Sequence, residues 1–523
     1  MWLAVFVGLV ALGSAWALAT PLASPPDEAS HVARAYALVH GSLVGTVPGI
    51  PQPAAVTAVE VPAGITALQS DAACVNRAPA VPATCVNRVV GSGRLVPHLI
   101  YTGRYPPLYY ALVGLPALAV RTPGVVYWMR LVSVVLSSAF LAAAVVVLRW
   151  RGAGPLGYAG VALAATPTAL YLAATVNPNG LEISAALCLW VALAALVSGR
   201  GAASGAPGGV NGVGGMVAVA GISAVVVVLA RGDSPLWPPV IAACLAPLAS
   251  RARISALWRR RDVRWCLVAV VAAYVAAGVW ILAENALAAL PSGAPLRGSP
   301  LHHLRLVVDE VPRWLLEYVA TFGNLTTSAP KGVYVAVAVA VVVVVGLGLA
   351  RGGGRQRLSI ALTVAVGAAL PLALEYYQSG RYGAGAQGRY FLPLVVGIVV
   401  VPAVTVLGPG GGGGAGEPAR GIHARHRWAR RWVWVLGAVV AVYQAVTFAA
   451  VLHRFAVGVN GPLDPLATVA GAWVPPVPAL ALDTLFALAV LWVAGCLVVA
   501  SRGSADSVSS RTFRCTRPAS GVL

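Results

Sequence analysis

The sequence contains few charged residues and almost no lysine. Charged side chains make up 10% of its 523 residues, whereas a soluble domain carries about 25%, and this shortage excludes an ordinary soluble protein. Lys331 is the single lysine among 36 basic residues. The sequence also lacks a zinc-ligand spacing, a nucleotide phosphate loop, a serine nucleophile elbow and a dinucleotide fingerprint, so ATP-driven transport by this chain alone has no support. Basic and aromatic residues do not alternate as they do in nucleic-acid-binding proteins, and no nucleic-acid partner is expected.

Apolar residues dominate instead, at 59% of the sequence with a mean hydropathy of +0.81. They form runs of about 20 residues, the length that an α-helix needs to cross a bilayer, and these runs recur along the whole chain. The predicted fold class is therefore all-α: a polytopic membrane protein with about 12 transmembrane helices. The predicted spans are 2–22, 125–148, 155–175, 181–198, 214–231, 235–250, 265–284, 332–350, 358–376, 390–407, 432–452 and 480–500.

Arginines are unevenly distributed over the segments that join these spans. The loops and tail on one side hold 21 arginines and three acidic residues, and the other side holds 15 basic and 13 acidic residues. Because positive charge stays in the cytoplasm, we assign the first group, with both termini, to the cytoplasmic face of the plasma membrane. The first span lacks the basic start of a signal peptide, so we expect it to be retained. One membrane domain over 1–500 and a disordered cytoplasmic tail over 501–523 complete the predicted organisation.

Two large loops are predicted to face outward, over 23–124 and 285–331. In the first, the apolar residues 106–120 are too few to cross the bilayer, and we predict that they form a juxtamembrane helix. If residues 106–120 did span the membrane, either the basic loops or the acidic residues after the first span would lie on the other side. In the second, Leu301 to Phe322 has the period of an amphipathic helix lying at the membrane surface.

Two of the seven cysteines, Cys74 and Cys85, lie in the first outer loop with ten residues between them. An oxidising exterior favours a disulfide between them, and the alternative is two unpaired thiols. The other five cysteines fall in predicted spans or in the inner tail, where a plain apolar role is the default.

An acidic pair, Asp27 and Glu28, follows the first predicted span in a Pro-Pro-Asp-Glu-Ala-Ser-His segment. Charged groups at the end of a membrane helix are costly unless they are paired or used. Asp27 can accept a proton from an acceptor hydroxyl, or it can bind a divalent metal that holds a phosphate. His31 and Arg34 would lie on the same helix face and could contact the substrate. The alternative is an ordinary helix start, capped by its acidic residues.

Further segments place polar residues at the predicted outer ends of spans. An arginine precedes a tyrosine-rich turn over 104–110, which suits an amphiphile with a phosphate head or a plain interfacial anchor. The turn over 177–182 holds asparagines and a glutamate, and it can line a site or cap a helix. An arginine at the start of a later span can bind phosphate with both arms of its guanidinium. The candidate substrate-binding residues are Arg104, Tyr105, Tyr109, Asn177, Asn179, Arg389 and Tyr390, with Glu182 as a further catalytic candidate. Arg231 and Asp233 are interpreted as an internal pair within a tight turn.

In this order, these segments resemble the membrane protein family known as domain of unknown function 2142, which is similar to the GT-C superfamily of membrane glycosyltransferases. The resemblance implies a multi-span fold, an acidic motif in the first outer loop followed by juxtamembrane helices, and a polyprenyl-phosphate sugar donor. It implies that Asp27 is the base or metal ligand, Glu28 its partner and Glu182 the acid of the second loop. The matching segments are Pro25 to His31 with Arg34-Ala35-Tyr36, Tyr105 to Tyr110, Pro167 through Glu182, Phe322 to Leu325, and Gly388 to Pro393.

The function we predict is therefore transfer of a sugar from a polyprenyl-phosphate carrier to an envelope glycan or lipid at the outer face of the bilayer. Asp27 would take the acceptor proton, and Arg389 with Arg104 would neutralise the leaving phosphate. Two alternatives stay open. A carrier for lipid-linked glycans would need polar residues deep in several spans, and a non-catalytic assembly factor would use Asp27 only as a helix cap.

Overall fold

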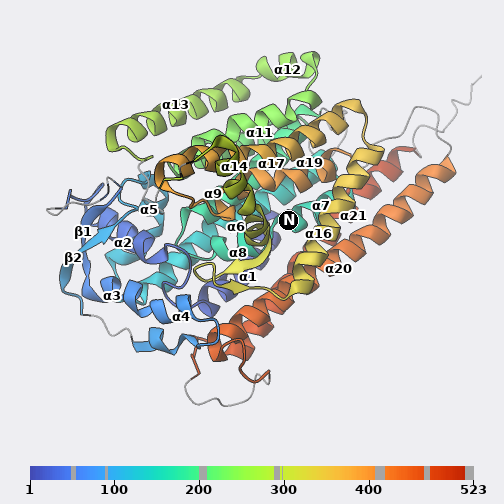
Figure 1. The fold of residues 1–523 in the computed structure, drawn as a ribbon. Helices are drawn as coiled ribbons and strands as arrows, with labels where there is room; N and C mark the ends of the chain where they lie inside the picture. Colours follow the sequence, from blue (N-terminus) through green and yellow to red (C-terminus); the bar gives the residue numbers. More distant parts are fainter. Residues whose placement is uncertain are drawn as a thin grey trace, which may run out of the picture.

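The computed structural model describes residues 1–48, 53, 55–88, 92–198, 209–287, 295–296, 298–406, 419–463 and 472–512 (Figure 1). Within these ranges, ten helices are long and apolar enough to cross a membrane, and one bent pair of helices would make an eleventh. The predicted polytopic helical membrane fold is thus confirmed. The predicted span over 235–250 corresponds to a shorter apolar segment, Ser234–Leu248.

The long helices make up almost half of the chain. They are α1 (Trp2–Ala19), α6 (Val125–Arg151), α9 (Pro178–Val197), α10 (Gly209–Ala230), α13 (Arg261–Glu284), α16 (Lys331–Arg351), α17 (Gly354–Tyr382), the run of η5 (Gly388–Phe391), α18 (Leu392–Val395) and α19 (Gly397–Thr405), α20 (Ala419–Val457) and α21 (Ala479–Thr512). Shorter elements between them are η3 (Ser234–Leu236), α11 (Trp237–Leu245), η4 (Ala246–Leu248) and α12 (Arg251–Trp258). Residues 501–512, which we expected in a disordered tail, belong to α21, and 513–523 lie outside the described residues.

The bent pair consists of α7 (Pro155–Ala164) and α8 (Pro167–Ala173), whose axes differ by 66°. Pro167 has no backbone N–H that could continue the hydrogen-bond ladder of α7. Thr166 caps the start of α8, where its side chain accepts a hydrogen bond from the amide of Ala169 at 3.3 Å. A capping threonine followed by proline is a typical helix start. The break therefore follows from the local sequence.

Helix α9 forms the centre of the bundle, with 89% of its apolar stretch buried. It packs against α6, α10 and α19, which explains why apolar residues surround it on all sides. Its Trp190 donates a hydrogen bond to the carbonyl of Pro393 at 3.0 Å. A Cβ on Gly397 would lie 2.4 Å from the Trp190 ring, so this glycine allows the close approach of α19.

The first loop folds into short elements that gather at one end of the bundle, which we call the first-loop end (Figure 1). Strands β1 and β2 form an antiparallel pair in which Thr57 lies opposite Ile100. The all-α prediction missed this small sheet. The pieces formed by residues 106–120 are too short to cross a membrane. The elements are α2 (Glu28–Val39), β1 (Thr57–Pro62), α3 (Ala63–Asp71), α4 (Ala73–Arg77), η1 (Ala83–Arg88), β2 (Leu95–Ile100), α5 (Pro107–Val113) and η2 (Leu115–Leu118).

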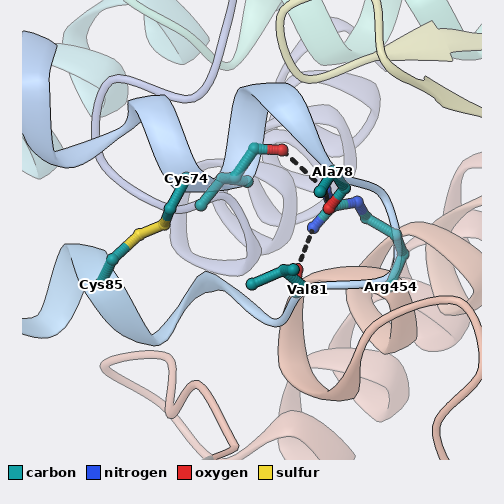
Figure 2. Close-up of a disulfide and its surroundings, with 6 residues drawn as sticks. Cys74, Ala78, Val81, Cys85 and Arg454 are labelled. Carbon is teal, nitrogen blue, oxygen red and sulfur yellow. Dashed lines mark hydrogen bonds between the residues drawn. A yellow bond between two sulfur atoms is a disulfide. The ribbon is translucent and has the colours of Figure 1, made fainter.

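A disulfide between Cys74 and Cys85 joins α4 to η1, with their Cα atoms 6.5 Å apart (Figure 2). The segment that it closes rests on α20. Arg454 donates hydrogen bonds to the carbonyls of Ala78 and Val81 at 3.2 Å each, and its buried guanidinium also reaches a third carbonyl. The first loop is thereby attached to the C-terminal part of the bundle.

The second loop contains α14 (Pro300–Asp309), α15 (Val311–Ala320) and a hairpin of β3 (Thr321–Phe322) and β4 (Thr327–Ser328). The single helix predicted from Leu301 to Phe322 is wrong, because the chain breaks at Glu310 and restarts with a proline in the first turn of α15. Proline at that position is typical of a helix start. Helix α15 packs against η5.

Candidate functional site

The turn that follows α1 places Asp27 at the start of α2 in a left-handed conformation, with φ +63°. Such a conformation is uncommon for a residue other than glycine. The Asp27 carboxylate makes no capping bond to α2. Instead, Oδ1 accepts a hydrogen bond from the hydroxyl of Tyr101 at 2.7 Å, and Oδ2 pairs with Arg389. The contacts of Asp27 therefore differ from those of a simple helix cap.

The Asp27 side chain is 28% exposed, so it lies at the edge of the protein interior. Burial by itself would raise the pKa of Asp27, but the charge of Arg389 and the hydrogen bond from Tyr101 bring that pKa below its ordinary value of 3.8. The carboxylate is consequently ionised at neutral pH and carries the negative charge of the site.

Arg389 extends from η5 and is almost fully buried. Its Nη2 donates to Asp27 and, at 3.2 Å, to the hydroxyl of Tyr390. Its Nε and Nη1 are buried and have no hydrogen-bond partner among the described residues. Buried donors are nearly always paired, and an unpaired one is costly. A phosphate or carboxylate ligand can accept a charge-assisted hydrogen bond from such a donor.

The loop before Arg389 is held by two neighbouring helices. Glu317 of α15 accepts a hydrogen bond from the amide of Gly388, and Arg313 donates to Glu317 at 2.9 Å. Glu375 of α17 accepts from the amides of residues 385 and 386, at 2.9 and 3.2 Å. These contacts fix the direction in which η5 presents its arginine.

A second arginine, Arg231, lies beside the first. Its guanidinium stands 4.7 Å from the centre of the Tyr390 ring, and that of Arg389 stands 5.0 Å from the same centre. The predicted pair with Asp233 is present at 3.5 Å, and Glu182 lies 3.6 Å away. Arg231 Nη1 nevertheless has no hydrogen bond within the described part of the chain. We did not expect this arginine to contact Tyr390.

Glu182 is completely buried in α9. Its Oε1 accepts hydrogen bonds from Ser234 at 2.6 Å and from Trp237 at 2.8 Å, and its Oε2 accepts one from Asn179 at 3.1 Å. Among the described residues, no hydrogen bond or ion pair joins this carboxylate to Asp27. Its link to the site is the ion pair with Arg231 at 3.6 Å.

Glu28 points away from Asp27, into the bundle. Its carboxylate pairs with both arms of Arg130 on α6, at 2.8 and 2.6 Å, and both side chains are fully buried. The same carboxylate accepts hydrogen bonds from the amides of Ala23 and Val176, each at 3.0 Å. The remaining donors of Arg130 bind main-chain carbonyls at the end of α1. All these groups are satisfied, so Glu28 holds the acidic turn in place.

Asn177 also supports the acidic turn. It begins α9, where its side-chain oxygen accepts from the amide of Asn179 at 3.0 Å. Its side-chain nitrogen donates to the carbonyl of Pro26 at 3.1 Å. The turn over 177–182 thus combines the helix-capping role with a contact to the residue before Asp27.

His31 lies one turn after Asp27 and bonds through Nδ1 to the hydroxyl of Tyr110 at 2.8 Å. Burial lowers the pKa of His31 from 6.5 to about 3, although the charge of Asp27 acts in the opposite direction. The imidazole is therefore neutral at physiological pH and can donate or accept a hydrogen bond without a change of charge.

Acidification is expected to destabilise the protein through His31. An unfolded chain binds a proton at this histidine below pH 6.5, but the folded chain does not until about pH 3. Within that window the free energy of unfolding falls by about 1.4 kcal/mol per pH unit as the pH drops. Denaturant titration at pH 6.5 and 5 checks this, with His31→Gln as the comparison. Equal losses in the two proteins would contradict the expectation.

The remaining candidates from the first loop differ in how close they lie to Asp27. Arg34 is buried under the ring of Tyr110, 5.6 Å away, and burial lowers the pKa of Arg34 to about 10. Tyr105 packs on His31 at 5.9 Å. Arg104 donates to the carbonyl of Glu284, and Tyr109 bonds to Ser133, both at 2.8 Å and away from Asp27. The structure therefore brings together five of the twelve candidates, and it adds two residues that the sequence did not assign to the site. The five are Asp27, His31, Tyr105, Arg389 and Tyr390, and the two are Tyr101 and Arg231.

An apolar cavity of about 550 Å³ lies among the helices that pack around η5 and α18. Residues of α15, α16, α17, α18 and α19 line it, including Leu392, three residues after Arg389. Trp314 also lines it and packs on Phe391 with the ring centres 5.3 Å apart. The segment from η5 into α18 therefore carries both Arg389 and part of the cavity lining.

A divalent metal at Asp27 is not favoured by the donors around it. Among the described residues, no three His, Cys, Asp or Glu side chains are grouped to hold a metal. The neighbours of the Asp27 carboxylate are a guanidinium and a phenol, whereas magnesium and calcium require several oxygen ligands. The site therefore does not fit such an ion.

Fold and site together define a multi-pass membrane protein with a buried cluster of arginines and tyrosines around one aspartate. A family model described as "Predicted membrane protein (DUF2142)" matches residues 10–398, and the chain belongs to this family. No curated protein matches the sequence. Among solved structures, the chain is similar to ArnT from Cupriavidus metallidurans bound to undecaprenyl phosphate, and to the same protein in the apo state, with TM-scores of 0.45 and 0.44. Identity is 12% in both, over 96% of this chain and 77% of the other.

Proposed function

We propose that the protein is a membrane glycosyltransferase that uses a polyprenyl-phosphate-linked sugar. The observation that carries the proposal is the buried guanidinium of Arg389, which has two unpaired donor nitrogens and lies beside the Asp27 carboxylate. A phosphate oxygen can accept a charge-assisted hydrogen bond from either of these donors. Arg231, on the same tyrosine, offers a second positive charge to the same ligand.

The apolar cavity supports a lipid-linked substrate. A polyprenyl chain is an extended hydrocarbon. Transfer of its apolar surface out of water is favourable, so such a chain binds in an apolar, pre-formed cleft. Leu392, three residues after Arg389, is one of the residues that line the cavity of about 550 Å³. A phosphate bound at Arg389 would thus leave the first isoprenoid units at the cavity.

The transfer step follows from the two charges. The oxygen of an acceptor hydroxyl attacks the anomeric carbon of the sugar and forms the new bond, and its proton passes to the Asp27 carboxylate. The bond between that carbon and the phosphate oxygen breaks, and the oxygen keeps the electron pair. Arg389 and Arg231 stabilise the charge that develops on the leaving phosphate. A phosphate that shares Arg389 weakens its pairing with Asp27, which makes the carboxylate a stronger base.

The distribution of arginines supports an outer-face site in the plasma membrane with cytoplasmic termini. In that orientation the first-loop end faces outward, and the acceptor is an envelope glycan or lipid. The polyprenyl carrier enters the cavity laterally from the lipid bilayer.

Loss of Arg389 is expected to weaken binding of undecaprenyl phosphate, measured with the full-length protein in lipid nanodiscs. Charged hydrogen bonds contribute about 1.5–3 kcal/mol, so Arg389→Met is expected to lower affinity by about 10- to 100-fold. Arg389→Lys keeps the charge but loses the planar fork, and we expect an intermediate affinity. The control is Arg260→Met, which removes a partly exposed arginine paired with Asp262. Unchanged affinity in a folded Arg389→Met protein would overturn the proposal.

A further inference from the structure

Helix α12 and the start of α13 lie at the end of the bundle opposite to the first-loop end (Figure 1). The other end of α13 is attached to the first loop, because Arg104 donates to the carbonyl of Glu284 and its own carbonyl accepts from Trp280 at 2.9 Å. Helix α13 has 24 residues, so a rise of 1.5 Å per residue places its beginning about 36 Å from that attachment. The surface at α12 is therefore separate from the site around Asp27.

This surface is strongly basic. Six arginines and one acidic residue lie in the segment over 251–264. Two of the arginines are engaged within the protein, since Arg253 donates to the carbonyl of Leu196 and Arg260 pairs with Asp262, each at 2.8 Å. The side chains of the other four are exposed and make no hydrogen bond or ion pair within the described ranges; they are Arg251, Arg259, Arg261 and Arg264. Like charges this close repel one another, so an anion among them is stabilised.

Large apolar side chains are exposed between these arginines. Ile254 and Trp258 lie one turn apart on the same side of α12 and are 54% and 61% exposed, and Trp265 of α13 is 73% exposed. Tryptophan is enriched where a membrane helix meets the headgroups. Arginine can place its stem on apolar surface while its guanidinium reaches the phosphates. The surface thus presents both kinds of group that bind a phospholipid.

The charge of the surface selects an anionic lipid. The ammonium group of a zwitterionic headgroup would be repelled by the unpaired arginines, whereas a phosphatidylglycerol headgroup carries only its negative phosphate. Basic clusters directly beside a membrane helix attract anionic lipids for this reason. A soluble acidic protein fits less well, because the exposed tryptophans continue the outer surface of α13, whose apolar stretch is only 11% buried within the protein.

We propose that α12 and the start of α13 form a binding site for an anionic phospholipid. The headgroup phosphate lies among the four unpaired arginines, and the acyl chains pack against Trp258 and Trp265. This inference does not depend on the proposed sugar transfer, because the two surfaces lie at opposite ends of α13.

The test uses the full-length protein in phosphatidylcholine nanodiscs with a minor fraction of lipid whose acyl chains carry bromine, which quenches tryptophan on contact. Emission from Trp258 and Trp265 is the difference between the wild type and Trp258→Phe/Trp265→Phe. Quenching by brominated phosphatidylglycerol, relative to brominated phosphatidylcholine, gives the preference at this surface. We expect a preference of at least about fivefold, the effect of one arginine beside an anionic lipid. The variant Arg251→Gln/Arg259→Gln/Arg261→Gln/Arg264→Gln should lose it.

The matched control is Arg94→Gln/Arg121→Gln/Arg305→Gln/Lys331→Gln, which removes four exposed positive charges from other surfaces. It lowers the net charge by the same amount and should keep the preference. Equal quenching by the two brominated lipids in the wild type would overturn the proposal and favour a soluble acidic partner. A preference that persists in the first glutamine variant, or that is lost equally in the control, also contradicts a lipid site at α12.

Discussion

Asp27→Asn is expected to abolish sugar transfer in membrane vesicles, with a loss of at least about a hundredfold, the lower range for a general base. Asparagine has the same shape, and its oxygen can still accept the hydrogen bond from Tyr101 that Asp27 accepts at 2.7 Å. It cannot accept a proton from the acceptor, and it removes the negative charge beside Arg389. The measurement is transfer of labelled sugar from a glycosylated undecaprenyl phosphate.

The matched control is Glu60→Gln, which neutralises an exposed acid on β1 in the same loop. Its transfer rate should equal that of the wild type. If Asp27→Asn retains more than a tenth of the transfer while the protein is inserted and folded, Asp27 is not the base. A fully active Asp27→Asn protein would favour the non-catalytic assembly factor.

Glu28→Gln is expected to have the largest effect on stability, a loss of about 3–5 kcal/mol in the free energy of unfolding. Glu28 and Arg130 are both fully buried and joined through two hydrogen bonds. An amide in place of the carboxylate leaves the Arg130 charge uncompensated inside the bundle. Denaturant titration of the detergent-solubilised protein measures the difference.

Asp262→Asn is the control, because it breaks an ion pair with Arg260 that is partly exposed to solvent. Exposed pairs contribute about 0–1 kcal/mol, so the loss should be much smaller. The double variant Glu28→Met/Arg130→Met removes both charges and should recover part of the stability. A loss below about 1 kcal/mol for Glu28→Gln would show that the buried pair does not hold the turn.

The membrane-spanning part of the fold was predictable because each membrane helix can be recognised from its own residues. About 20 consecutive apolar residues indicate a membrane helix without knowledge of its neighbours. The bend at Pro167 and the break before α15 also have a local signal, since a proline stands at each restart. We read Leu301 to Phe322 as one helix because its apolar period continues across Pro312.

The site was only partly predictable. Asp27 and Arg389 were candidates because each is a charged residue at the end of an apolar run, and the structure places them in contact across 362 residues of sequence. Glu28 and Asp27 look equivalent in the sequence, yet their carboxylates point in different directions. Tyr101 directly follows β2 and has no motif that indicates a role. The strand pair that positions it was missed as well, because its strands are separated by more than 30 residues.

The sequence by itself determined that this chain is a polytopic helical membrane protein with an acidic motif after its first helix, because hydropathy and charge are properties of neighbouring residues. Only the tertiary structure decided that Glu28 pairs with Arg130, 102 residues away, whereas Asp27 is left beside Arg389 and partly exposed. It also decided that Arg231 approaches Tyr390. These contacts depend on which helices pack together, and the packing of apolar faces on one another is not encoded in any single segment.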